Sequence, residues 1–107
     1  NKILLNKKFE NYELIEGDVF KTIPKFLENN NTKKIALLHL DMDVYKPTKF
    51  VITKLFNKMS KNGIILIDDY SETVGATKAI DEFLKIKKNL KIKKLSYYKL
   101  PAYILIP

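Results

Sequence analysis

The chain has 107 residues, 46% of them hydrophobic, which is typical of a folded domain and excludes a disordered segment. It contains no cysteine, which excludes disulfides and fits a cytoplasmic protein, and no apolar run or signal-peptide pattern indicates a membrane association. The net charge of +8 comes from lysine alone, and because arginine is the residue that reads phosphates and bases bidentately, no specific nucleic-acid binding is expected.

The first thirty residues predict a helix end, a strand and a second helix. Residues 1–11 resemble the tail of a helix, and residues 12–15 predict a short strand. Apolar side chains then recur at the spacing of one helical face: Ile23, Phe26 and Leu27. Pro24 suits the start of this helix, and the asparagines at residues 29–31 predict its end.

Two near-continuous apolar runs follow, and each ends in carboxylates. The first run begins at Ile35 and ends at Asp41, and the second begins at Gly63 and ends at Asp68. A helix is predicted between them, with Asn62-Gly63 as its C-terminal cap. Its apolar face consists of Ile52, Leu55, Phe56 and Met59. Two such strands joined by a helix predict a βαβ unit with parallel, adjacent strands.

The remaining chain predicts one more helix and an antiparallel pair of strands. The helix starts around Gly75, and its inward residues are Ala76, Ile80, Phe83 and Leu84. Residues 91–98 and 102–106 predict strands, and the short turn between them makes the pair an antiparallel hairpin. The predicted fold class is therefore α/β, with ligands expected at the carboxyl edge of the parallel strands.

Asp41, Asp68 and Asp69 should converge at this edge. Like charges so close cannot all stay ionised unless a cation neutralises them, and all-oxygen ligation favours Mg²⁺. The alternative is that these aspartates only cap the helices that follow. His39, inside the first apolar strand, is more typical of a hydrogen-bonded core histidine than of a ligand.

Three mechanistic classes use an apolar strand that ends in acids. Asp41-Met42-Asp43 matches the short Asp-x-Asp motif with which glycosyltransferases hold a metal on a nucleotide sugar. A phosphoacceptor receiver domain also has an acidic pair after a strand, but only 38 residues follow Asp69, too few for the rest of that fold. The third class is metal-assisted methyl transfer.

Three motifs together resemble the macrocin O-methyltransferase family. They are His39-Leu40-Asp41-Met42-Asp43-Val44-Tyr45, then Gly63-Ile64-Ile65-Leu66-Ile67-Asp68-Asp69-Tyr70, then Gly75-Ala76-Thr77-Lys78-Ala79-Ile80-Asp81-Glu82-Phe83. Their order and spacing are those of the family, whose members methylate sugar hydroxyls with S-adenosylmethionine. The resemblance implies a Rossmann-like class I methyltransferase fold with sheet order 3-2-1-4-5-7-6.

The resemblance also implies roles for particular residues. The family's metal ligands fall on Asp41, Asp68 and Asp69, and its proposed general base falls on Asp43. For Asp43, the alternative is an N-cap for the helix at Pro47. Asp18 and Val19 lie where class I methyltransferases often contact adenine.

The chain departs from the family in lacking the glycine-rich cofactor loop, because its glycines are Gly17, Gly63 and Gly75 alone. Residues 1–107 are therefore expected to form the C-terminal part of a single Rossmann-like domain. This part comprises strands 3 to 7 with their helices and the C-terminal antiparallel hairpin. The isolated chain is expected to be inactive, and its uncovered strand edge could support a homo-oligomer.

The resulting hypothesis is an S-adenosylmethionine- and Mg²⁺-dependent O-methyltransferase that acts on a sugar or sugar-like hydroxyl. Two alternatives remain at this point. An Asp-x-Asp glycosyltransferase would bind a nucleotide diphosphate sugar instead of S-adenosylmethionine. A non-enzymatic basic binding module would lose its affinity steeply with added salt.

Overall fold

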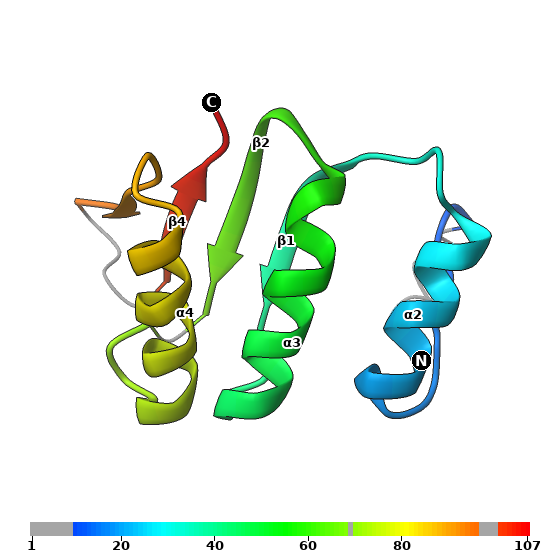
Figure 1. Ribbon diagram of the computed structural model, residues 1–107, viewed down its shortest axis with the longest axis horizontal. Coiled ribbons are helices and arrows are strands. Elements are labelled where there is room, and N and C mark those ends of the chain that lie inside the picture. Colours follow the sequence, from blue (N-terminus) through cyan, green and yellow to red (C-terminus); the bar gives the residue numbers. More distant parts are fainter. Residues whose placement is uncertain (1–9, 69, 97–100) are drawn as a thin grey trace.

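The computed structural model describes residues 10–68, 70–96 and 101–107, which form helices packed on a mixed sheet (Figure 1). The described elements are α2 (Val19–Asn29), β1 (Ile35–Leu40), α3 (Tyr45–Leu55), the 3-10 helix η1 (Phe56–Lys58), β2 (Met59–Ile67), α4 (Val74–Ile86), β3 (Ile92–Lys94) and β4 (Ala102–Leu105). This confirms the predicted α/β class. The helix end predicted for residues 1–11 lies almost entirely outside the described residues.

The sheet has the strand order β1-β2-β4-β3. β1 and β2 are parallel neighbours, as the βαβ pattern predicts, and β4 runs antiparallel to both β2 and β3. The antiparallel pairing of the last two strands is therefore confirmed, with β4 inserted between β2 and β3. This order corresponds to the 4-5-7-6 half of the sheet order expected from the resemblance.

The core lies between the sheet and helices α3 and α4, which cover the same face of the sheet (Figure 1). Alternate residues of the strands point into it, and Leu40, Ile65, Ile67 and Ile104 are among those at 3% exposure or less. The helices contribute side chains at the predicted periodicity, including Ile52 and Ile80, both at 0%. Complete burial of one such side chain stabilises the fold by about 1.5–3 kcal/mol.

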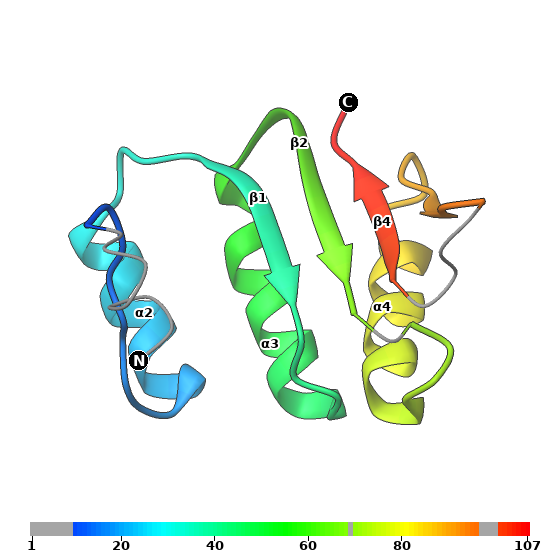
Figure 2. The same cartoon turned by 180° about the vertical axis from the view of Figure 1, so that it is seen from behind.

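The opposite face of the sheet is open in the described part of the chain (Figure 2). Leu37, Ile64 and Leu105 lie side by side across three strands on this face, and their exposures are 60%, 37% and 46%. The outer edge of β1 likewise has no described strand beside it. Parallel sheets are normally covered on both faces, so this apolar surface is unusual for the fold class.

Two boundaries between helix and strand differ from the prediction. The helix α3 ends at Leu55, and Met59 is the first residue of β2, where it pairs with Ile35 and is buried. Asn62-Gly63 is therefore a bend inside β2 rather than a helix cap, and Asn62 has a positive φ of 65°. These residues belong to the strand and not to the helix because of two backbone hydrogen bonds with Ile106. The Asn62 amide donates to the Ile106 carbonyl, and the Ile106 amide donates to the Gly63 carbonyl.

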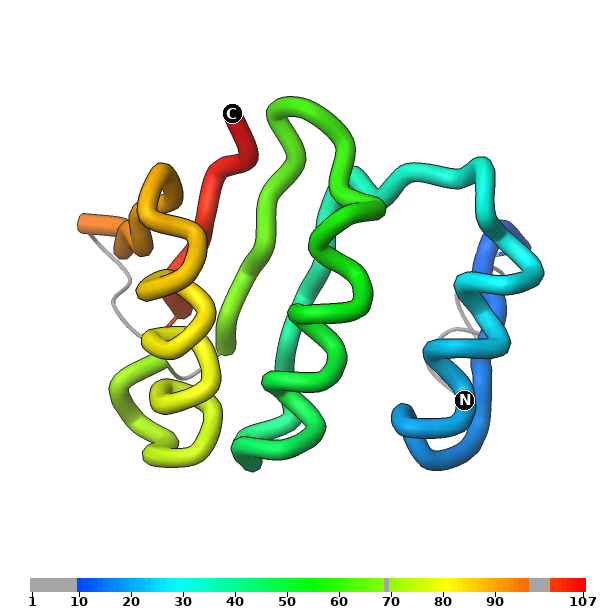
Figure 3. The backbone as a smooth tube through the Cα atoms, in the orientation of Figure 1, coloured from blue at the N-terminus to red at the C-terminus, as the bar shows by residue number. Residues whose placement is uncertain are grey.

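The strand predicted at residues 12–15 is not formed. An extended segment becomes a strand only when a neighbouring strand accepts its hydrogen bonds, and no described strand lies beside this one. The segment instead runs back beside α2 (Figure 3), where Glu13 and Ile15 line a pocket together with Thr22 and Phe26 of that helix. None of the described helices has the length and hydropathy needed to cross a bilayer.

Candidate functional site

The strands β1 and β2 end side by side, and an aspartate follows each of them directly. Leu40 pairs with Ile67 at the end of the parallel ladder, and the Asp68 amide donates to the Leu40 carbonyl at 3.0 Å. Neighbouring strands lie about 4.8 Å apart, so Asp41 and Asp68 leave the sheet as close neighbours. The structure therefore brings these two predicted ligands to one edge, whereas Asp69 lies outside the described residues.

The amino ends of two helices reach the same edge (Figure 1). The helix α3 begins at Tyr45, two residues after Asp43, and α4 begins at Val74 in the loop that follows Asp68. The amino end of a helix carries a partial positive charge, which favours nearby carboxylates. The fold therefore supplies part of the charge compensation that an acidic edge requires.

His39 lies on the open face of the sheet, and its side chain is 47% exposed. The prediction of a core histidine is therefore wrong, because β1 is an edge strand and no described element covers this face. The His39 Nε2 atom is 3.9 Å from the Asp68 Oδ1 atom, which is too long for a hydrogen bond but close enough for an electrostatic contact. His39 is thus a neighbour of a predicted metal ligand.

Asp43 occupies a strained turn immediately beyond the edge. Its φ is 59°, in the left-handed region, and the Val44 amide donates across it to the Met42 carbonyl at 2.6 Å. A hydrogen bond between residues i and i+2 around a positive φ has the form of a γ-turn, a rare and strained conformation. Strained residues cluster at functional sites, and aspartate is among the few residues that tolerate this region.

The helix-cap alternative for Asp43 is not what the structure shows. The N-cap of α3 is Val44, and within the described chain no side chain caps this helix. The Asp43 side chain is exposed at the edge. Helix capping therefore does not explain the presence of a carboxylate at this position.

The loop after Asp68 is tied to α4 by two side-chain contacts. The Tyr70 hydroxyl donates to Asp81 at 2.5 Å, and the Ser71 amide donates to the Thr77 hydroxyl at 2.9 Å. Ser71, like Asp43, has a positive φ, here 76°. Both loops that leave the acidic edge thus contain a residue in the left-handed region, and α4 holds the second loop in place.

Tyr70 gives this contact a measurable pH dependence. Partial burial, together with the hydrogen bond to Asp81, raises the pKa of Tyr70 to about 12 from an ordinary value of 10.0. Since the folded-state pKa is the higher one, the stabilisation is complete below pH 10 and is lost as the pH rises toward 12. We expect Tyr70→Phe to flatten this alkaline loss in urea unfolding curves.

The exposed Tyr12 provides the matched control for that experiment. Tyr12→Phe removes a tyrosine hydroxyl outside this loop and should leave the contact between Tyr70 and Asp81 in place. Equal alkaline losses in wild type and Tyr70→Phe would show that the Tyr70 hydroxyl does not hold the loop.

A polar cluster joins the first turn of α3 to α4. The Tyr45 hydroxyl donates to Glu82 at 2.5 Å, and the Lys49 Nζ atom lies 2.9 Å from the same carboxylate oxygen and 2.8 Å from the Tyr45 hydroxyl. The pKa of Glu82 is lowered and the pKa of Lys49 is raised, and hydrogen bonding with Tyr45 is the main cause of both shifts. No sequence pattern indicated this cluster, because its members come together only when the helices pack.

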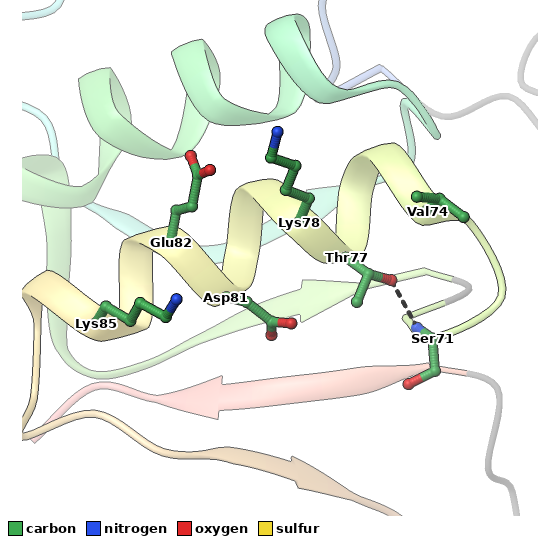
Figure 4. A pocket seen from close by; sticks show the side chains of 7 residues that line it. All are labelled: Ser71, Val74, Thr77, Lys78, Asp81, Glu82 and Lys85. Carbon is green, nitrogen blue, oxygen red and sulfur yellow. Dashed lines mark hydrogen bonds between the residues drawn. The ribbon is translucent and has the colours of Figure 1, made fainter.

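An open pocket of about 520 Å³ lies along the outer side of α4 (Figure 4). It begins at Ser71 and Val74, beside the acidic edge, and continues to Lys85. Its two carboxylates point in different directions, Glu82 toward α3 and Asp81 away from it (Figure 4). Both are engaged by tyrosines, so this pocket forms the flank of the acidic edge rather than its centre.

The two residues predicted near adenine lie at the start of α2. The Asp18 Oδ1 atom accepts from the Phe20 amide at 2.9 Å and so caps this helix. Val19 lines an apolar groove of about 390 Å³ between α2 and β1. The other residues of this groove are Ile15, Thr22, Ile23, Phe26, Ile35, Leu38 and Leu55. Contact with a cofactor stays a prediction for both residues.

The donor set at the acidic edge suits a hard divalent ion. Asp41 and Asp68 offer only oxygen ligands, which Mg²⁺ prefers over nitrogen and sulfur. Among residues 10–68, 70–96 and 101–107, no group of three or more acidic or histidine side chains is close enough to hold a metal ion. The third predicted ligand, Asp69, is outside these ranges, so the complete set stays a prediction.

Comparison with known proteins gives a consistent picture. The macrocin-O-methyltransferase (TylF) family model matches residues 3–95. The demethyldecarbamoylnovobiocin O-methyltransferase of Streptomyces niveus is 28% identical over 83 residues, which represent 74% of this chain and 31% of that protein.

Two solved structures extend the comparison. The apo structure of CalS11, a TDP-rhamnose 3'-O-methyltransferase of calicheamicin biosynthesis, matches with a TM-score of 0.78 and 31% identity, over 86% of this chain and 40% of that one. The O-methyltransferase NovP matches with a TM-score of 0.83 and 22% identity, over 98% of this chain and 42% of that one. The chain therefore spans less than half the length of each of these relatives.

Proposed function

Because the chain belongs to the macrocin O-methyltransferase family, we propose that it provides the acidic half of an S-adenosylmethionine- and Mg²⁺-dependent sugar O-methyltransferase. The observation that carries this proposal is the placement of Asp41 and Asp68 at adjacent strand ends, with the strained Asp43 turn beside them. The family match favours this function over a glycosyltransferase or a basic binding module.

The proposed mechanism assigns a separate role to each acid. When bound, Mg²⁺ would make an acceptor hydroxyl more acidic and S-adenosylmethionine would supply the methyl group. Asp41 and Asp68, with Asp69, would hold the cation, and Asp43 would accept the proton of the hydroxyl as general base. The acceptor class, a sugar or glycoside hydroxyl, is supported by CalS11, which acts on TDP-rhamnose.

We further propose that the glycine-rich cofactor loop is supplied from outside these 107 residues. The chain has three glycines, none in such a loop, and it spans less than half of its relatives. The exposed leucines and isoleucine on the open face of the sheet are the surface that a complementing half would cover. Self-association of the isolated chain through the uncovered outer edge of β1 is part of this proposal. A cytoplasmic location is also part of it.

A titration with S-adenosylmethionine tests the proposal. We expect the isolated chain to show no binding at about millimolar cofactor, because the contacts to ribose and to the methionine moiety are missing while the entropic cost of association is unchanged. The completed enzyme, in which an upstream half bearing the glycine-rich loop is joined to the chain, should bind and methylate a nucleotide sugar.

Circular dichroism of the isolated chain is the control, because it shows that a lack of binding heat does not come from unfolding. Saturable heat at micromolar cofactor would contradict the proposed division of the site. A completed enzyme that binds S-adenosylmethionine but methylates no sugar would contradict the proposed acceptor class.

A further inference from the structure

Gly75 lies where the first turn of α4 meets the backbone at the start of α3. A Cβ atom at Gly75 would be 2.7 Å from the Tyr45 amide nitrogen and 3.2 Å from the Val44 carbonyl carbon and Cα. Real Cβ atoms essentially never come closer than 3.0 Å to such atoms. The two backbones therefore touch directly, and any side chain at Gly75 would push them apart.

The segment that Gly75 contacts is the downstream arm of the Asp43 turn. The Val44 amide closes this turn by donating to the Met42 carbonyl at 2.6 Å. The Val44 carbonyl accepts from the Thr48 hydroxyl at 2.7 Å, and Thr48 is a polar residue buried to 1% exposure. Val44 is thus held by the bare backbone of α4 on one side and by a buried hydroxyl on the other.

A strained turn persists only when its surroundings over-determine it. The φ of 59° at Asp43 is such a conformation, and no contact of its own exposed side chain is needed to explain it. The Asp43 side chain is exposed, so the position of its carboxylate follows the backbone of the turn. That backbone depends on where Val44 is held. The contacts with Gly75 and Thr48 supply that restraint.

We propose that Gly75 and Thr48 are positioning residues that hold the Asp43 turn, and hence the Asp43 carboxylate, at the acidic edge. The effect of these residues on catalysis rests on the proposed function. Their restraint on the turn does not depend on that function. Gly75→Ala should displace Val44 and relax the turn. Thr48→Val should remove the hydroxyl bond to the Val44 carbonyl and leave only the longer bond from the Thr48 backbone amide at 3.3 Å, which should loosen the turn. Thr48→Ser retains the hydroxyl and should preserve the turn.

Gly63 offers a matched control for the loss of a packed glycine. A Cβ atom there would lie 2.8 Å from the Ser60 carbonyl oxygen and 3.0 Å from that of Ala36, a clash as severe as at Gly75. Gly63 lies in the middle of β2, and the rest of the strand up to Ile67 separates it from Asp68. Gly63→Ala should therefore destabilise the fold without a specific effect on the Asp43 turn.

Amide hydrogen exchange in the 107-residue chain provides the first measurement. We expect the Val44 amide to exchange about tenfold faster in Gly75→Ala and Thr48→Val, beyond the change seen for core amides, because a strained turn opens more easily once its surroundings no longer hold it. Gly63→Ala and Thr48→Ser should leave the Val44 amide unchanged relative to the core. If Gly75→Ala does not fold, the comparison of Thr48→Val with Thr48→Ser tests the restraint on the turn.

Kinetics of the completed enzyme provide the second measurement. Gly75→Ala and Thr48→Val should lower kcat by about 10–100-fold, because a misplacement near 1 Å costs up to that much, while the KM for S-adenosylmethionine changes less than about twofold. Gly63→Ala should keep the kcat of its folded fraction. Equal effects of Gly75→Ala and Gly63→Ala on exchange and kcat would reduce Gly75 to a packing residue and overturn the inference.

The two measurements separate the inference from the proposed function. An unchanged Val44 exchange rate in both Gly75→Ala and Thr48→Val overturns the restraint on the turn, whatever the enzyme does. Faster exchange in both variants supports the restraint even if the completed enzyme methylates no sugar, an outcome that would count against the proposed function alone.

Discussion

Replacing Asp43 with asparagine is expected to lower kcat of the completed enzyme by about 10²–10⁴-fold, the usual contribution of a general base. Asparagine keeps the shape of the side chain and tolerates the positive φ of 59° at this position, so the turn should persist. What is lost is the ability to accept a proton from the acceptor hydroxyl. Affinity for the metal and for S-adenosylmethionine should be nearly unchanged, because Asp43 lies beyond the two strand ends.

Steady-state kinetics together with metal titration check this expectation. Asp43→Ala is an informative companion, because alanine removes the carboxylate and is also poorly tolerated at a positive φ. It should therefore lose stability that Asp43→Asn keeps, with a similar loss of kcat. A loss of metal affinity in Asp43→Asn would instead identify Asp43 as a ligand.

Replacing Asp68 with asparagine is expected to weaken metal affinity and activity together. The carboxylate follows β2 directly and lies at the edge shared with Asp41, so its removal would take one anionic oxygen ligand from the proposed cation site. We expect the dissociation constant for Mn²⁺, used as a spectroscopic substitute for Mg²⁺, to rise at least about tenfold. The kcat/KM at limiting metal should fall in proportion, and excess metal should recover part of it.

Asp81 supplies the control for a lost negative charge near this edge. Its carboxylate accepts from Tyr70 on the flank of α4, away from the strand ends. Because asparagine keeps a side-chain oxygen that can accept from the Tyr70 hydroxyl, Asp81→Asn should leave the loop after Asp68 in place and Mn²⁺ affinity unchanged. If Asp68→Asn binds Mn²⁺ as tightly as wild type, the assignment of Asp68 as a ligand is wrong.

Much of the fold could be predicted from local patterns. The apolar runs that end at Asp41 and Asp68 predicted two parallel neighbours, because strands buried in a parallel sheet lack the alternation of half-exposed ones. The periodic apolar residues of α3 and α4, such as Ile52 and Ile80, predicted the buried helix faces. The acids could be placed at one edge because parallel strands bring their carboxyl ends together.

Other features required the packed structure, since they depend on contacts distant in sequence. Met59 continues the apolar spacing of α3, yet it pairs with Ile35 in the sheet, because a strand neighbour outweighed helical periodicity. His39 reads as a core residue in an apolar run, but its exposure depends on β1 having no described neighbour on its outer side.

The same reasoning applies to the site. The sequence by itself determined which acids stand at the strand ends, because that follows from the alternation of apolar runs, helices and turns along the chain. Only the tertiary structure decided that Asp43 sits in a strained turn, with Gly75 and Thr48 against its downstream arm. The approach of α4 to Val44 brings together residues 31 positions apart, and a contact of that kind follows from helix packing rather than from any local pattern.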